Sequence, residues 1–248
     1  MSGIEAIAFD LDGTLVDTAG GIAHALNSAL AEAGLPAFNE RTVRTWIGDG
    51  PDALIARALG AHEPGTADPH GLAARLRRGF DAATLQAPMQ GSSVFDGVLQ
   101  LLATLAARHP LVVVTNKPTP LARAVLHAAG LLPHFAAVLG PETAEQRKPS
   151  PHLLQQAGEV LGVDTRSLLM VGDAEGDIAA ARAAGCRAAW AGWGYTPHAP
   201  ASVSTRVWRL HTPLDLLARL APEPRGHTKN QSRRTPCPPV ESPRSRSS

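Results

Sequence analysis

The chain has 248 residues, of which 44% are apolar and 18% charged, and its formal net charge is +1. This composition is typical of a soluble globular protein with one large domain, or with a core that carries an insertion. Two cysteines, Cys186 and Cys237, exclude a disulfide framework and a four-cysteine zinc site, which favours a reducing, cytoplasmic location. No run of about 18 apolar residues predicts a membrane span, and the N-terminus shows no secretory signal.

The first predicted element is a buried strand at residues 4–9 that ends at two carboxylates. Because residues two apart on a strand face the same side, we expect Asp10 and Asp12 to converge at its carboxyl end. Two crowded acids repel each other unless a cation or a shared proton separates them, which favours a divalent metal ion. One such carboxylate can also act as a nucleophile and the other as an acid and base. A strand ending in an acidic turn is the simpler alternative.

Residues 18–87 carry helical patterns and no strand pattern. Predicted helices run from 18 to Gly34, over 40–47, from Pro51 to a point before Gly60, and over 72–84. We therefore expect an all-helical cap domain at 18–87, inserted between two parts of a core at 1–17 and 88–221.

From Val94 onward, predicted strands alternate with predicted helices. The strands lie at 111–114, 136–139, 167–171 and 187–190, and the helices follow 97 and cover 120–130, 151–161, 176–184 and 213–220. This alternation predicts a Rossmann-like, three-layer α/β core with a parallel sheet covered on both faces. In such sheets ligands bind outside the carboxyl ends of the strands.

The C-terminal segment 222–248 differs in composition from the rest. It is rich in Pro, Ser and Arg, with six basic and two acidic residues, a net charge of +4, whereas the remainder carries −3. We expect this basic Pro/Ser-rich tail to be disordered, with partner binding as an alternative to a plain solvated tail. The folded part has no basic stripe, so no nucleic-acid partner is expected for it.

Other polar residues also follow predicted strands. A hydroxyl and exposed amides at Thr115 and Asn116 can donate to phosphate oxygens, although in isolation an ordinary turn capped by a threonine is the favoured explanation. Asp173 ends one strand and Asp177 begins the next helix, and such hard oxygen ligands suit Mg²⁺. A calcium-like acidic loop, or simple helix capping by Asp177, is the alternative. Without the other segments, the sequence around Lys148 indicates only a lysine exposed to solvent.

Together these four segments, in this order, resemble the four motifs of the haloacid dehalogenase superfamily, in the form of its phosphoglycolate phosphatase-like members. The resemblance implies that Asp10 is the nucleophile that forms an aspartyl phosphate and that Asp12 is the acid/base. It implies phosphate binding by Thr115 and Asn116, and a bridging role for Lys148 between Asp10 and the phosphoryl oxygens. It also implies that Mg²⁺ is bound by Asp10, by the backbone oxygen of Asp12 and by Asp173, with Asp177 as a supporting ligand. One departure is Ala174, where relatives often have serine.

The resemblance thus predicts a Mg²⁺-dependent phosphatase for a small phosphorylated metabolite, with 2-phosphoglycolate as the best single substrate, in a monomer or homodimer. The loop 45–50, with Gly48, is the expected specificity loop of the cap. A sugar phosphomutase is an alternative. It is disfavoured because this chain has Pro51 and Asp52 where the β-phosphoglucomutases of the family usually carry an arginine. A haloacid dehalogenase is disfavoured by Asp12, and a catalytically silent binding module with a basic tail stays open.

Overall fold

A computed structural model describes residues 3–62, 71–196, 198–199 and 206–221. Within these residues the main sheet has six strands in the order β5-β4-β1-β6-β7-β8, and all neighbours are parallel. The strands are β1 (Ala6–Phe9), β4 (Leu111–Val114), β5 (Ala137–Leu139), β6 (Leu168–Gly172), β7 (Arg187–Ala191) and β8 (Trp208–Leu210). The predicted parallel α/β core is therefore confirmed.

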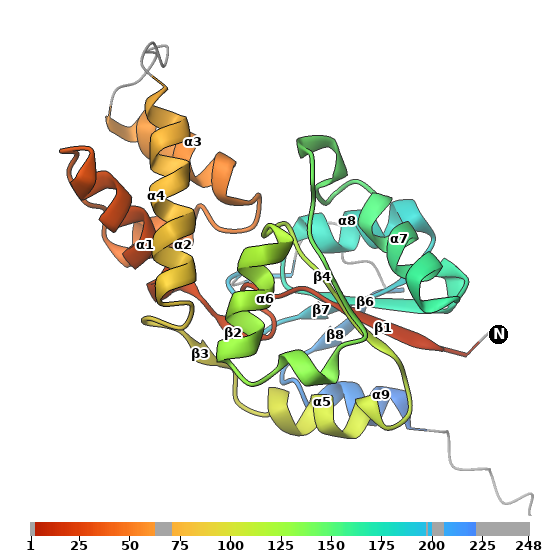
Figure 1. Ribbon diagram of the computed structural model, residues 1–248. Helices are drawn as coiled ribbons and strands as arrows, with labels where there is room; N and C mark the ends of the chain where they lie inside the picture. Colours follow the sequence, from red (N-terminus) through yellow and green to blue (C-terminus); the bar gives the residue numbers. More distant parts are fainter. Residues whose placement is uncertain (1–2, 63–70, 197, 200–205, 222–248) are drawn as a thin grey trace, which may run out of the picture.

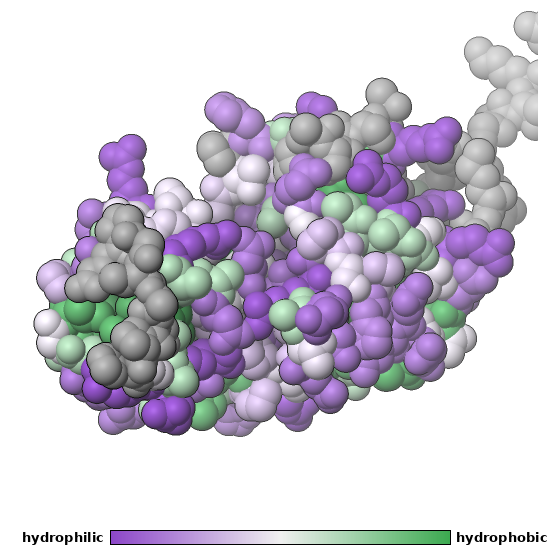
Figure 2. Space-filling view, turned by 90° about the horizontal axis from the view of Figure 1, so that it is seen from above, coloured by the Kyte–Doolittle hydropathy of each residue, from purple (hydrophilic) through white to green (hydrophobic). Residues whose placement is uncertain are grey.

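Helices cover both faces of this sheet because its strands are apolar on both sides (Figure 1). On β1, Ile7 and Phe9 face one layer, whereas Ala6 and Ala8 face the other. The first layer contains α5 (Val98–Ala106), α6 (Thr119–Ala128) and α9 (Asp215–Leu220). The second contains α7 (His152–Leu161) and α8 (Glu175–Ala184). Figure 2 shows a mainly hydrophilic outer surface over this part of the molecule.

A helical bundle lies beside the sheet, between β1 and β4 in sequence (Figure 1). It consists of α1 (Ala19–Glu32), α2 (Glu40–Arg44), α3 (Pro51–His62) and α4 (Leu72–Gln86). Its own apolar cluster includes Leu26, Ile55, Leu76 and Phe80. An antiparallel ribbon of β2 (Val16–Asp17) and β3 (Ser93–Val94) lies where the chain enters and leaves the bundle. The domain limits at 18–87 and 88–221 stay a prediction, and the tail 222–248 lies outside the described residues.

Several boundaries differ from the sequence-based expectation. Helix α3 continues through Gly60 to His62, because the apolar face around Leu59 still packs against the bundle and outweighs the cost of a helical glycine. Helix α2 ends at Arg44, and Trp46 and Ile47 then pack against the bundle from a turn. The ribbon and β8 were not predicted, since two or three residues carry too little periodicity. No described helix combines the length and apolarity needed to cross a bilayer.

Candidate active site

The carboxyl ends of three neighbouring strands place polar residues at one edge of the sheet. Asp10 follows β1, Thr115 follows β4 and Asp173 follows β6. In the sheet register, Phe9 pairs with both Val113 and Val171, so the three strands end at nearly the same level. Parallel pairing therefore brings together residues separated by more than a hundred positions in sequence.

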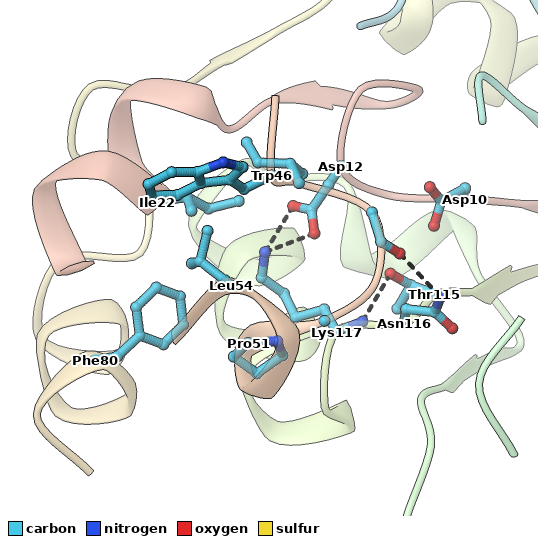
Figure 3. A pocket seen from close by; sticks show the side chains of 13 residues that line it. Asp10, Asp12, Ile22, Trp46, Pro51, Leu54, Phe80, Thr115, Asn116 and Lys117 are labelled. Atoms are coloured by element: carbon cyan, nitrogen blue, oxygen red, sulfur yellow. Dashed lines mark hydrogen bonds and ion pairs between the residues drawn. The ribbon is translucent and has the colours of Figure 1, made fainter. Parts of the chain in front are cut away.

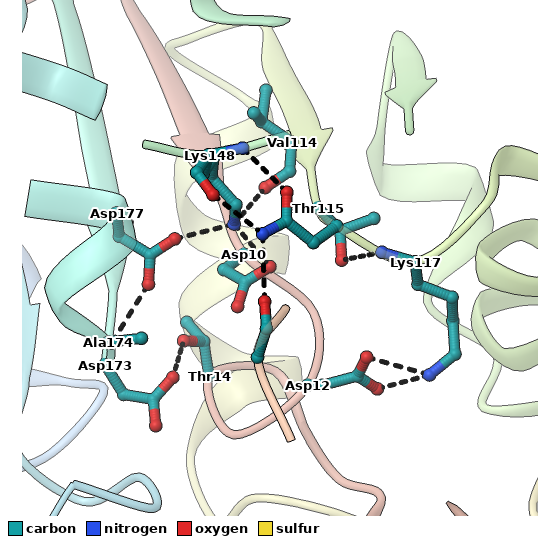
Figure 4. Close-up of polar contacts among 12 residues, drawn as sticks. Asp10, Asp12, Thr14, Val114, Thr115, Lys117, Lys148, Asp173, Ala174 and Asp177 are labelled. Atoms are coloured by element: carbon teal, nitrogen blue, oxygen red, sulfur yellow. Dashed lines mark hydrogen bonds and ion pairs between the residues drawn. The ribbon is translucent and has the colours of Figure 1, made fainter. Parts of the chain in front are cut away.

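Lys148 enters this edge from the segment before α7, and its side chain is 3% exposed. Its Nζ donates to Asp10 Oδ1 at 2.8 Å, to Asp177 Oδ1 at 2.6 Å and to the Val114 carbonyl at 2.9 Å (Figure 4). All three donor positions of the ammonium are therefore used. Burial alone would lower the pKa of Lys148, but the two carboxylates raise it above its ordinary value, so the lysine stays charged.

Three buried carboxylates gather around this lysine. Asp10, Asp173 and Asp177 each offer an oxygen within 4.8 Å of the others. Burial raises the pKa of Asp10 to about 6, an increase that the charge of Lys148 reduces. Burial, followed by the charges of Asp177 and Asp10, raises the pKa of Asp173 to about 8. One ammonium leaves this cluster short of positive charge.

The donor set of this cluster fits a hard divalent cation. Carboxylate oxygens are the ligands that Mg²⁺ prefers, and the crowding that raises the carboxyl pKa values is what such a cation relieves. The two oxygens of Asp177 already accept hydrogen bonds, from Lys148 and from the backbone N–H of Ala174 at 3.0 Å. Asp177 therefore holds Lys148 in position, while both oxygens of Asp173 accept hydrogen bonds from the Thr14 hydroxyl at 3.3 Å and the Tyr195 N–H at 2.7 Å.

Asp12 points away from this cluster. Its carboxylate accepts from Lys117 Nζ at 2.6 and 2.8 Å (Figure 4). It also accepts from the Thr18 hydroxyl at 2.7 Å. Sequence reasoning assigned no role to Lys117, although its position three residues beyond the end of β4, at the same sheet edge, was a usable signal. An acid/base role for Asp12 therefore requires its side chain to turn toward Asp10.

The predicted phosphate-binding residues lie in the same region with different hydrogen-bond partners. The Thr115 hydroxyl accepts from the backbone N–H of Lys117 at 3.2 Å, which leaves its own hydrogen free to donate. The side-chain NH₂ of Asn116 donates to the carbonyls of Lys148 and Gly48, and its side-chain oxygen accepts from the backbone N–H of Lys148. A phosphate contact from Asn116 would therefore come from its backbone N–H, while its side chain holds two loops together.

Tyr195 is a second residue to which the sequence-based interpretation gave no role. Its backbone N–H donates to Asp173 Oδ2 at 2.7 Å, and its hydroxyl accepts from the backbone N–H of Thr18 at 2.6 Å. Burial raises the pKa of Tyr195, so the phenol stays neutral. It connects the acidic cluster to the residue that binds Asp12.

A cavity of about 440 Å³, including space open to solvent, connects this edge with the helical bundle (Figure 3). From the sheet edge it is lined by Asp10, Asp12, Thr115, Asn116 and Lys117, and from the bundle side by Ile22, Trp46, Ile47, Gly48, Gly50, Pro51, Leu54 and Phe80. The cavity thus combines a polar floor with a largely apolar wall, as is usual for small-molecule sites.

Comparison with known proteins gives a family for this architecture. The model of haloacid dehalogenase-like hydrolases matches residues 7–191. The chain is 43% identical over 193 residues to a phosphoglycolate phosphatase of Yersinia pseudotuberculosis, covering 77% of this chain and 82% of that one. It is 42% identical over 203 residues to a phosphoglycolate phosphatase of Rhodospirillum rubrum, covering 80% and 84%.

Solved structures give the same result. A crystal structure described as a predicted phosphoglycolate phosphatase from Haemophilus somnus matches with a TM-score of 0.80 at 31% identity, covering 89% of this chain and 100% of that one. CbbY from Rhodobacter sphaeroides in complex with phosphate matches with a TM-score of 0.74 at 27% identity, covering 88% and 99%. The chain therefore belongs to the haloacid dehalogenase-like hydrolase family, and within it is similar to phosphoric monoester hydrolases named phosphoglycolate phosphatase.

Proposed function

We propose that this protein is a Mg²⁺-dependent phosphatase that hydrolyses 2-phosphoglycolate to glycolate and phosphate. The observation that carries the proposal is the buried Asp10–Lys148 pair beside Thr115, at the floor of a cavity and next to a cluster of further carboxylates. The names of the relatives described above supply the substrate.

In the first step, a carboxylate oxygen of Asp10 attacks the phosphorus in line, and the bond from phosphorus to the ester oxygen breaks. The hydroxyl of Thr115 and the ammonium of Lys148, which exchanges one of its three present hydrogen bonds, hold the phosphoryl oxygens, where negative charge must be stabilised. A folded-state pKa of about 6 keeps Asp10 mostly ionised at neutral pH, as a nucleophile requires.

Asp12 then takes part in both halves of the reaction. After turning from Lys117 toward the ester oxygen, Asp12 takes up a proton from solvent and gives it to the departing glycolate alcohol. In the second step it accepts a proton from the water that attacks the phosphorus of the aspartyl phosphate. The bond between phosphorus and the Asp10 oxygen breaks, which releases free phosphate and restores the Asp10 carboxylate.

A bound Mg²⁺ would neutralise charge on the phosphoryl oxygens. Asp10, Asp173 and the backbone oxygen of Asp12 would hold it, and Asp177 would support it through Lys148 and α8. The helical bundle, taken as a cap domain at 18–87, would cover the ester during the reaction and exclude water. Gly48 would contribute through the loop that Asn116 ties to the core.

Steady-state phosphate release from a panel of phosphorylated acids and sugars tests this proposal. We expect the highest kcat/KM for 2-phosphoglycolate, dependence on Mg²⁺ and loss of turnover in Asp10→Asn. Turnover that survives both Asp10→Asn and complete removal of Mg²⁺ would refute the mechanism. Interconversion of sugar phosphates without net phosphate release would indicate the phosphomutase alternative instead.

The oligomeric state and location belong to the same proposal. We expect a monomer or a homodimer. We also expect a location in the cytoplasm, which the cysteine content favours. Light scattering coupled to size-exclusion chromatography measures the first, and cell fractionation the second. A larger stable assembly would contradict the expected oligomeric state.

A further inference from the structure

Lys117 is a buried cation that lines the cavity. In the mechanism proposed above it does not contact the substrate. Its side chain is 5% exposed, and its Nζ contacts both oxygens of Asp12. Among the described residues that line the cavity, it is the only one with a positive charge. The wall opposite consists of apolar side chains, which are Ile22, Trp46, Ile47, Pro51, Leu54 and Phe80. A leaving group in this cavity therefore meets one ammonium and otherwise mainly apolar surface.

The position of Lys117 suits contact with the part of the substrate that leaves. Its backbone N–H bonds the Thr115 hydroxyl at 3.2 Å, so the two residues share one turn at the end of β4. Figure 3 shows the Asp12–Lys117 pair between Asp10 and Thr115 on one side and Trp46, Leu54 and Phe80 on the other. A phosphoryl group at Asp10 and Thr115 would direct the rest of a small ester toward Lys117 Nζ.

We propose that Lys117 determines substrate class by binding a carboxylate on the leaving group in exchange for Asp12. This inference rests on the proposed phosphatase function and deepens it. A buried ammonium that loses its only carboxylate partner is left with an uncompensated charge, which is strongly unfavourable. A neutral leaving group cannot replace Asp12 at Lys117, whereas a carboxylate can.

The exchange also connects recognition to the chemical step. Once the substrate carboxylate occupies Lys117, Asp12 keeps its hydrogen bond to the Thr18 hydroxyl at 2.7 Å but loses the ion pair that points it away from Asp10. Its carboxyl group can then turn toward the ester oxygen. Phosphorylated hydroxy acids would therefore release the acid/base, while neutral esters would leave it paired with Lys117.

The test compares 2-phosphoglycolate with 2-hydroxyethyl phosphate, in which a neutral hydroxymethyl group replaces the carboxylate. We expect wild-type kcat/KM to favour the carboxylate by about 10- to 100-fold, the range for one charge-assisted hydrogen bond. Lys117→Met should lose this preference, and Lys117→Arg should keep most of it. Arg123→Met, which removes an exposed charge on α6, is the matched control and should leave the preference unchanged.

Other outcomes would overturn the inference. If Lys117→Met slows both esters equally and keeps the preference, Lys117 merely positions Asp12. If the methionine variant fails to fold, the wild-type comparison still decides, because equal kcat/KM for the two esters contradicts recognition by Lys117 while leaving the phosphatase function standing. Lack of turnover with every ester in Mg²⁺ would refute the proposed function and this inference with it.

Discussion

Replacement of Asp173 by asparagine should stabilise the metal-free protein, although Asp173 belongs to the candidate metal site. The carboxyl group is 2% exposed and lies close to Asp10 and Asp177. Its hydrogen-bond partners, the Thr14 hydroxyl and the Tyr195 N–H, can both bond an amide of the same shape. Asp173→Asn therefore removes a carboxyl group whose ionisation is unfavourable without a cation and keeps the packing.

The size of the effect follows from the pKa of Asp173. It rises from 3.8 to about 8 on folding, so between these values the folded state holds a proton that the unfolded state has lost. Stability of the wild type therefore falls as pH increases across this window. At 1.36 kcal/mol per unit, the cost grows with each pH unit above 3.8 and reaches about 4 kcal/mol at pH 7. The asparagine variant has no such cost.

Urea unfolding in EDTA at pH 5, 6 and 7 measures this difference. We expect the free energy of unfolding of Asp173→Asn to exceed that of the wild type at each pH, with a gap that widens by about 3 kcal/mol between pH 5 and 7. Added Mg²⁺ should stabilise the wild type and have little effect on the variant. Asp96→Asn, the same change at an exposed site, should alter stability by less than about 0.5 kcal/mol. A less stable Asp173→Asn protein, or a gap that is constant with pH, would refute the reasoning.

Three further predictions test the rest of the molecule. Asp10→Asn should lower phosphate release by at least about 10³-fold with an unchanged circular dichroism spectrum, and a smaller loss would argue against Asp10 as nucleophile. Lys148→Met should lower the free energy of unfolding by about 3–5 kcal/mol, because it leaves Asp10 and Asp177 buried without their partner; urea unfolding measures this, and an unchanged midpoint would contradict it. A chain that ends at Ala221 should keep its kcat/KM, whereas loss of activity would give the tail 222–248 a role.

Much of the core could be predicted because its signals are local. The apolar run at 111–114 coincides with β4, and the predicted strands at 167–171 and 187–190 agree with β6 and β7 within one residue at each end. Buried parallel strands have a continuous apolar pattern, and the helices between them have their own period. The short ribbon of β2 and β3 has neither, and pairing across the bundle produces it.

The sequence by itself determined that Asp10, Thr115 and Asp173 lie at one edge, because each follows a strand of a parallel sheet. Tertiary structure alone decided that Asp12 faces Lys117, which is 105 residues away, and that the Asn116 side chain bonds the backbone of Lys148. The physical reason is that strand and helix patterns depend on neighbours along the chain. The partner of a buried charge depends instead on which distant segments the folded core places within hydrogen-bond distance.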